Sequence, residues 1–128
     1  MTDPWEDIHS FAPSEFDSPD APGSGLLMNI EFIHLLDKIR AKCGFPFIIN
    51  SGYRTSSHNA EVKGKSESAH TKGVAVDIAA MTSGERKSIV KNALDMGICR
   101  IGIGSNFVHL DMDYTLPQDV IWLYDKVV

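Results

Sequence analysis

The chain has 128 residues, 43% of them hydrophobic, which predicts one folded domain with one core and argues against a disordered protein. Its net charge is −5 and its basic residues are scattered, so we expect no nucleic acid partner and no docking to an anionic lipid surface. Residues 1–20 lack the apolar segment of a signal peptide, and no apolar run approaches the roughly 20 residues of a membrane span. We therefore expect synthesis in the cytoplasm without a signal peptide, and no membrane span.

The first 25 residues hold four of the six prolines and two of the ten glycines, a composition typical of an irregular arm. Large apolar side chains could pin this arm to the core: Trp5, Ile8, Phe11 and Phe16. We expect residues 1–25 to form an N-terminal arm that packs on a domain formed by residues 26–128.

Apolar residues recur at three- and four-residue steps over 26–43, which predicts an amphipathic helix that ends at Gly44. A short buried strand is predicted over residues 47–49, followed by a polar loop over residues 50–67. A loop of that length in a compact domain is usually functional or mobile. The next strand is expected over 73–79.

Thr82–Glu85 is a capping box that predicts a second helix, closed by Gly97. Its predicted inner face contains Ile89, Val90, Ala93 and Leu94. Residues 98–103 and 107–112 predict a hairpin, and 120–124 predict either a final strand or a turn of helix. This order predicts the α+β class: a small single domain with a central antiparallel sheet and two main helices.

Two histidines and an aspartate on short apolar segments could hold one divalent metal ion. His70 precedes a strand that places Asp77 on the face opposite three apolar residues, where a carboxylate is costly to bury without a cation. His109 lies in a second strand, and such a histidine by itself is more often a hydrogen-bonded core residue than a ligand. If the three converge, they form a His₂Asp site that suits zinc, with other divalent metals possible.

Three motifs carry a resemblance to a known family. They are S-G-Y-R at 51–54, S-x-H-x-x-G-x-A-x-D at 68–77, and F-V-H-L-D at 107–111. Together they resemble the zinc D-alanyl-D-alanine peptidases of the M15 family, in the broader group that includes lysostaphin-type endopeptidases and the hedgehog domain. The resemblance covers roughly residues 11–125 and implies a hedgehog-like or D,D-peptidase-like fold. Residues 14–20 also look like small M15 proteins of bacteriophages and prophages.

The resemblance implies a role for each matching residue. Zn²⁺ would be bound by His70, Asp77 and His109. Arg54 would contact the substrate's carboxylate or carbonyl oxygen, for which a planar guanidinium is suited. Tyr53 would wall the pocket or belong to the core. Ser68 would orient a ligand or the substrate backbone.

One position departs from the family pattern. Many M15 enzymes have a catalytic carboxylate three residues before the last zinc histidine, where this chain has Asn106, and related enzymes have a histidine where it has Phe107. Asp111 is the first candidate for the general base, and it could equally be an outer partner that holds an imidazole. Glu67 and Asp113 are poorer candidates for the base.

The resulting hypothesis is a zinc-dependent peptidase that hydrolyses peptidoglycan stem peptides or cross-links, as a carboxypeptidase or an endopeptidase. Its partner would be peptidoglycan peptides, and we expect a monomer that acts on the cell wall after release or as a phage component. The alternative is a non-catalytic, zinc-stabilised wall-binding or virion domain, supported by the missing carboxylate at Asn106. A metal-free interaction domain, with both histidines in the core, is a third possibility.

Overall fold

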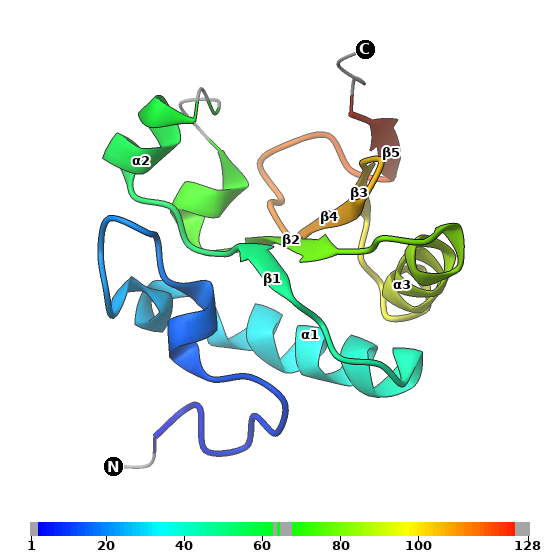
Figure 1. Cartoon of the computed structure of the whole chain (residues 1–128), viewed down its shortest axis with the longest axis horizontal. Helices are drawn as coiled ribbons and strands as arrows, with labels where there is room; N and C mark the ends of the chain where they lie inside the picture. The colour runs from blue at the N-terminus through cyan, green and yellow to red at the C-terminus, as the bar shows by residue number, and fades with distance from the viewer. Residues whose placement is uncertain (1–2, 63, 65–67, 125–128) are drawn as a thin grey trace.

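The computed structural model describes residues 3–62, 64 and 68–124 of the chain (Figure 1). The α-helices are α1 (Ile30–Cys43), α2 (Ser56–Glu61) and α3 (Ser83–Asp95). The strands are β1 (Ile49–Ser51), β2 (Ala75–Ala79), β3 (Arg100–Ile103), β4 (Phe107–Asp111) and β5 (Val120–Leu123). Short 3₁₀ helices are η1 (Pro13–Phe16), η2 (Ser24–Leu27) and η3 (Ala69–Lys72). Among the described helices, none is long and apolar enough to cross a membrane.

The five strands form one sheet in the order β1-β2-β4-β3-β5. Every neighbouring pair is antiparallel except β3 and β5, which run parallel. The α+β prediction is therefore confirmed, and the sheet is mixed but mostly antiparallel. The structure also decides between the two predictions for residues 120–124, because β5 is a strand that pairs with β3 along its whole length.

One face of the sheet packs against α1 and α3, which lie beneath and beside it in Figure 1. Strand side chains alternate between the two faces, so every second residue of β2, β3 and β4 enters this core. Five of these residues are fully buried: Val76, Ile78, Ile101, Val108 and Leu110. The residues between them lie on the opposite face, which is where the polar residues of the predicted site fall.

The first helix begins four residues later than predicted. Asn29 caps it, because the Asn29 side chain accepts a hydrogen bond from the backbone N–H of Phe32 at 3.0 Å. The preceding residues form η2, in which Leu26 and Leu27 are 63% and 62% exposed, so they do not extend the apolar face. The predicted end is correct, since Gly44 adopts the left-handed conformation with φ of 77°.

The predicted loop over 50–67 contains regular structure. The first strand begins at Ile49 and runs into the predicted loop, and Ile48 is 68% exposed. Thr55 then caps α2 by accepting a hydrogen bond from the backbone N–H of His58 at 3.1 Å. Residues 63 and 65–67 lie outside the described part of the chain. The following strand begins at Ala75, two residues later than predicted.

The second predicted helix is confirmed as α3. The Thr82 hydroxyl accepts a hydrogen bond from the Glu85 backbone N–H, and the Glu85 carboxylate accepts one from the Thr82 backbone N–H. Ile89 and Ala93 are fully buried as expected, but Leu94 is 50% exposed, so the inner face is narrower than predicted. The hairpin of β3 and β4 is also confirmed.

The N-terminal arm contributes to the single hydrophobic core. Four of its side chains are buried in that core: Trp5, Ile8, Phe11 and Phe16. Phe16 also holds the backbone just after β1, because its carbonyl accepts a hydrogen bond from the Tyr53 backbone N–H at 2.8 Å. The arm therefore supports the segment that leads from the first strand toward the predicted site.

Candidate metal centre

Two of the three predicted ligands lie side by side on neighbouring strands. Asp77 of β2 is directly opposite His109 of β4 in the antiparallel register, so both side chains lie on the sheet face away from α1 and α3. His70 comes from η3, which Ser68 caps by accepting a hydrogen bond from the His70 backbone N–H at 3.2 Å. Gly73 ends η3 with φ of 72°, and a Cβ there would lie 2.6 Å from the carbonyl oxygen of Leu27.

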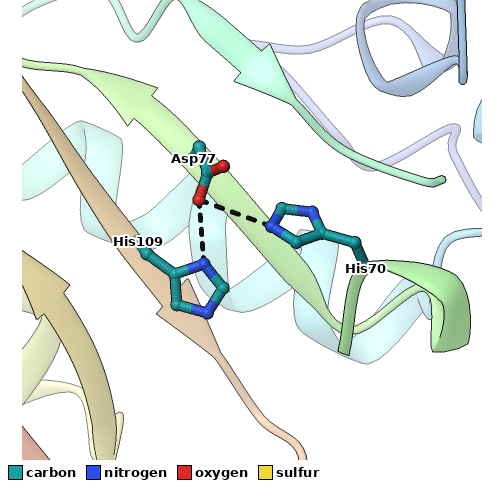
Figure 2. A group of neighbouring side chains, drawn as sticks. All are labelled: His70, Asp77 and His109. Atoms are coloured by element: carbon teal, nitrogen blue, oxygen red, sulfur yellow. Dashed lines mark hydrogen bonds and ion pairs between the residues drawn. The ribbon is translucent and has the colours of Figure 1, made fainter. Parts of the chain in front are cut away.

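The three side chains converge on one point (Figure 2). Asp77 Oδ1 lies 2.8 Å from His109 Nδ1 and 3.4 Å from His70 Nε2. One ligand atom from each residue lies within 4.8 Å of the others, which is a spacing that a single metal ion can bridge. His70 and His109 are 4% and 6% exposed, so the imidazoles are held in place by the surrounding protein.

Hydrogen bonds on the outer edges of both imidazoles fix which nitrogen faces the centre. His70 Nδ1 lies 2.8 Å from the carbonyl oxygen of Gly52, which can only accept, so Nδ1 donates there and Nε2 is the nitrogen that faces Asp77. His109 Nε2 lies 2.7 Å from Asp111 Oδ2, so the Nε2–H donates there and Nδ1 faces Asp77. Both inner nitrogens face the Asp77 carboxylate, and His109 Nδ1 lies within hydrogen-bond distance of it at 2.8 Å. Without their inner protons the two imidazoles would present two lone pairs beside one carboxylate, which is a donor set for a divalent cation with outer partners in place.

The electrostatics of the centre agree with this arrangement. Burial alone raises the pKa of Asp77, but hydrogen bonds from His109 and His70 outweigh it and hold the pKa well below the usual range. Burial lowers the pKa of His109, while hydrogen bonds to Asp111 and Asp77 raise it by more, so the net pKa is raised. Asp77 therefore stays ionised, and His109 lies between two carboxylates that attract a cation.

Asp111 is enclosed by partners. The Asp111 side chain is 1% exposed, and its Oδ2 accepts a hydrogen bond from His109. Its Oδ1 accepts two hydrogen bonds, from Arg100 Nε at 2.8 Å and from the Asp113 backbone N–H at 3.1 Å. The Arg100 guanidinium also donates to the carbonyl oxygen of Pro117 at 2.6 Å. This geometry places Asp111 behind His109, with its two oxygens directed at protein donors.

Asp113 is likewise paired. Its carboxylate forms an ion pair with Lys72 Nζ at 2.8 Å, and the Asp113 side chain is 2% exposed. Burial raises the pKa of Asp113, but Lys72 and Thr115 lower it by more, so the pKa is below its ordinary value. Because Lys72 belongs to η3, this pair ties the segment that carries His70 to the end of β4.

Arg54 lies between the centre and α2. Its backbone N–H donates to the His70 carbonyl at 3.1 Å, and its guanidinium donates to Asn59 Oδ1 at 3.0 Å and Ser51 Oγ at 3.2 Å. Arg54 Nε is buried and has no hydrogen-bond partner among the described residues. Burial lowers the pKa of Arg54, partly offset by the charge of Asp77.

Tyr53 and Ser68, the two other predicted substrate-binding residues, make contacts that stabilise the fold. Tyr53 is half-buried and packs against the hydrophobic core. Ser68 caps η3, and its backbone carbonyl also accepts a hydrogen bond from the Thr71 hydroxyl at 2.6 Å. Asn106, where many family members have a carboxylate, is exposed in the turn between β3 and β4. Glu67 lies outside the described residues.

Sequence reasoning missed four residues around the centre. Gly52 supplies the carbonyl that holds His70, and Arg100 holds Asp111. Trp122 and Tyr124 lie 5.4 Å and 6.4 Å from His109 between ring centroids. Trp122 and Tyr124 are two residues apart, a spacing that places both rings on one face if the segment is a strand. The sequence left open whether this segment is a strand or a helix, so the spacing alone could not place the rings.

Comparisons with known proteins agree with the geometry. The sequence model of the Peptidase M15 family matches residues 10–111, a range that includes His70, Asp77, His109 and Arg54. A search of curated proteins finds no match. The match covers most of the chain and all three residues of the centre, so the chain belongs to the M15 peptidase family.

Proposed function

We propose that this protein is a zinc-dependent peptidase that hydrolyses peptide bonds in peptidoglycan stem peptides or cross-links. The observation that carries the proposal is the convergence of His70 Nε2, His109 Nδ1 and Asp77 Oδ1, each fixed by an outer partner or by strand register. A His₂Asp set leaves a fourth position open, which is the composition of a catalytic rather than a structural zinc site. Membership of a peptidase family supports the same reaction.

His70, Asp77 and His109 would hold the ion. Zinc, when bound, polarises the scissile carbonyl and lowers the pKa of the attacking water. Gly52 and Asp111 keep both imidazoles in the tautomers that present a lone pair to the centre. We assign Asp111 to this positioning role rather than to the general base, because both its oxygens are occupied and it is 1% exposed.

Arg54 would bind the substrate's carboxylate on the β1 side of the centre. Its guanidinium is held in place by Asn59 and Ser51, and β1 places Ser51 directly opposite Asp77. A fixed guanidinium offers a planar fork that fits a carboxylate. Stem peptides carry such carboxylates, which is why the guanidinium supports peptidoglycan peptides as substrates. We propose that the protein reaches them after release from the cytoplasm or as part of a phage particle, and that it acts as a monomer.

Metal analysis and product analysis test this proposal together. The purified protein is expected to hold one zinc per chain and to release defined products from muropeptides, identified by mass spectrometry with and without a chelator. His70→Ala and His109→Ala are expected to lose both zinc and hydrolysis. His34→Ala is the matched control, because His34 lies on α1 outside the centre and should keep both. Hydrolysis by His70→Ala at the wild-type rate would refute the proposal.

A second candidate function follows from the same centre. Asp111 and Asp113 are both ion-paired and nearly fully buried, and position 106 carries an amide instead of a carboxylate. A zinc-stabilised wall-binding or virion domain would hold the metal without needing a free base. Such a protein would contain stoichiometric zinc and bind isolated cell walls, yet release no new amino groups from them, whereas the peptidase would release them.

A further inference from the structure

His70 differs from the other two candidate ligands in how the fold holds it. Asp77 and His109 are fixed by the register of β2 and β4, whereas His70 comes from η3, outside the sheet. Two contacts from the segment that follows β1 hold His70 in place. The Gly52 carbonyl lies 2.8 Å from His70 Nδ1, and the Arg54 backbone N–H donates to the His70 carbonyl at 3.1 Å. Whatever fixes residues 52–55 therefore decides where the His70 imidazole lies.

The N-terminal arm holds the other side of this segment, and it lies below α2 in Figure 1. The Tyr53 backbone N–H donates to the Phe16 carbonyl at 2.8 Å, and the Thr55 backbone N–H donates to Ser18 Oγ at 3.2 Å. An extended chain directs the backbone groups of successive residues to opposite sides. Residues 52 and 54 accordingly face η3 while residues 53 and 55 face the arm, so the segment lies between the two.

Ser18 and Asp20 form a polar clamp on Thr55. Ser18 is 1% exposed, and its hydroxyl donates to Asp20 Oδ1 at 2.6 Å while its oxygen accepts from the Thr55 backbone N–H. The other carboxylate oxygen, Asp20 Oδ2, accepts from the Thr55 hydroxyl at 2.6 Å. The Ser18 backbone N–H donates to Ser24 Oγ at 2.8 Å, which closes the turn that carries the clamp. The clamp therefore holds both the backbone and the side chain of Thr55.

The contribution of Asp20 is one of geometry rather than of burial. Asp20 is exposed, so it adds no apolar surface to the core. Hydrogen bonds from Ser18 and Thr55 lower the pKa of Asp20, so the carboxylate is ionised at neutral pH and both hydrogen bonds are charge-assisted. Such bonds are stronger than neutral ones, and these two end on the segment that holds His70.

We propose that Ser18 and Asp20 are positioning residues for His70, which they hold through residues 52–55 so that its Nε2 stays beside the Asp77 carboxylate. The inference rests on the zinc binding of the proposed function and is independent of which bond is cleaved. It gives the arm a part in metal affinity as well as in the core. Loss of the clamp should loosen the contacts of residues 52–55 and weaken zinc binding, while the sheet stays folded.

Amide hydrogen exchange in the metal-free protein tests the contact with η3. The Arg54 N–H, which donates to the His70 carbonyl, should exchange about tenfold faster in Ser18→Ala and in Asp20→Ala, as expected when one intramolecular hydrogen bond is lost. The Val108 amide, in β4 between two paired strands, reports unfolding of the whole sheet and should change much less. The comparison of the two amides separates a loosened segment from a destabilised fold.

Zinc affinity, measured by competition with a chromophoric chelator, gives the second readout. Ser18→Ala and Asp20→Ala should bind zinc about tenfold more weakly, at the low end of the range for groups that orient a metal ligand. Asp37→Ala is the matched control, because the Asp37 carboxylate also holds the arm, through the backbone N–H groups of His9 and Ser10, but holds it at α1. It should leave both the zinc affinity and the Arg54 exchange rate unchanged.

Two variants of Thr55 test the hydroxyl contact from the other side. Thr55→Ser keeps the hydroxyl that donates to Asp20 and should keep the wild-type exchange rates and zinc affinity. Thr55→Val removes that hydroxyl and should behave like Asp20→Ala. If Ser18→Ala does not fold, Asp20→Ala and Thr55→Val carry the comparison.

The outcomes that overturn the clamp differ from failure of the proposed function. If the Arg54 and Val108 amides accelerate equally, or neither accelerates, the clamp does not position His70. A wild type that binds zinc, with equal affinity in Asp20→Ala and Asp37→Ala, overturns the clamp as well and leaves the peptidase standing. If the wild type binds no zinc, the zinc-dependent peptidase fails, and the exchange rate of the Arg54 amide still decides whether the clamp fixes the segment that holds His70.

Discussion

His109 Nε2 lies 2.7 Å from Asp111 Oδ2, and the two residues are two positions apart on the same strand. A period of two puts both side chains on one face, so the strand itself aims the carboxylate at the outer edge of the imidazole. The other nitrogen of the ring is thereby directed at Asp77. One short strand thus supplies both a candidate ligand and the group that fixes its tautomer.

Asp111→Asn tests this relationship. The amide keeps the shape of the carboxylate and can still accept from His109, but it removes the charge that makes Nδ1 a better ligand. We expect zinc affinity to fall about 10- to 100-fold, measured by competition with a chromophoric chelator. Asp95→Asn is the control, because Asp95 is an exposed aspartate paired with Lys91 on α3, and it should leave affinity unchanged. Unchanged affinity in Asp111→Asn would contradict the positioning role.

Arg100→Ala should destabilise the protein strongly. Asp111 is 1% exposed, so removal of its cation leaves a buried charge without its main partner. Breaking such a pair typically costs about 3–5 kcal/mol in the free energy of unfolding, which denaturant titration measures. Lys91→Ala removes an exposed ion pair and should cost at most about 0.5 kcal/mol. A loss equal to that of Lys91→Ala would show that Asp111 does not depend on Arg100.

Gly52→Ala should weaken zinc binding, because the added methyl group would collide with Phe16 of the N-terminal arm. A Cβ at Gly52 would lie 2.8 Å from the Cα of Phe16, so the backbone must move, and the Gly52 carbonyl that holds His70 Nδ1 moves with it. We expect a loss of about 1–3 kcal/mol in stability together with weaker zinc binding. Gly84→Ala is the matched control, because a Cβ there meets nothing closer than 3.9 Å. Equal zinc affinity in the two variants would show that the position of the Gly52 backbone does not influence the metal centre.

Zinc should counteract the pH dependence of stability that His109 causes in the metal-free protein. The pKa of His109 is raised above its ordinary value of 6.5 in the folded protein, so the folded state binds more protons than the unfolded state above that pH. In the protein without metal, the contribution of His109 to the free energy of unfolding is therefore complete below about pH 6.5. It is lost as the pH rises through the folded pKa. Zinc competes with the proton for Nδ1, so its stabilising effect grows over the same range.

Melting temperatures at several pH values, with a chelator and with excess zinc, measure both trends. The chelated protein should melt at a lower temperature at pH 8 than at pH 6, and the increase caused by zinc should be larger at pH 8. His109→Gln should remove both trends, whereas His34→Ala should keep them. A chelated protein whose stability rises from pH 6 to 8 would show that His109 is not held between two carboxylates.

The sequence predicted helix ends correctly where the end is set by hydrogen bonds or backbone geometry of neighbouring residues. The capping box at Thr82 and the left-handed Gly44 set one end each of α3 and α1, because their hydrogen bonds and backbone geometry involve only neighbouring residues. The start of α1 was predicted wrongly, since periodicity continues through Leu26 while the structure turns the chain at η2. The strand character of residues 120–124 required the pairing with β3, which is a long-range contact.

The sequence by itself determined the candidate ligands, their spacing and the family, because His70, Asp77 and His109 stand in a recognisable order. Only the tertiary structure decided what surrounds them. It placed Asp111 behind His109 with Arg100 as its partner, and it brought Trp122 beside the centre. The physical reason is that strand order and register, set by burial of the opposite face against α1 and α3, decide which distant residues become neighbours.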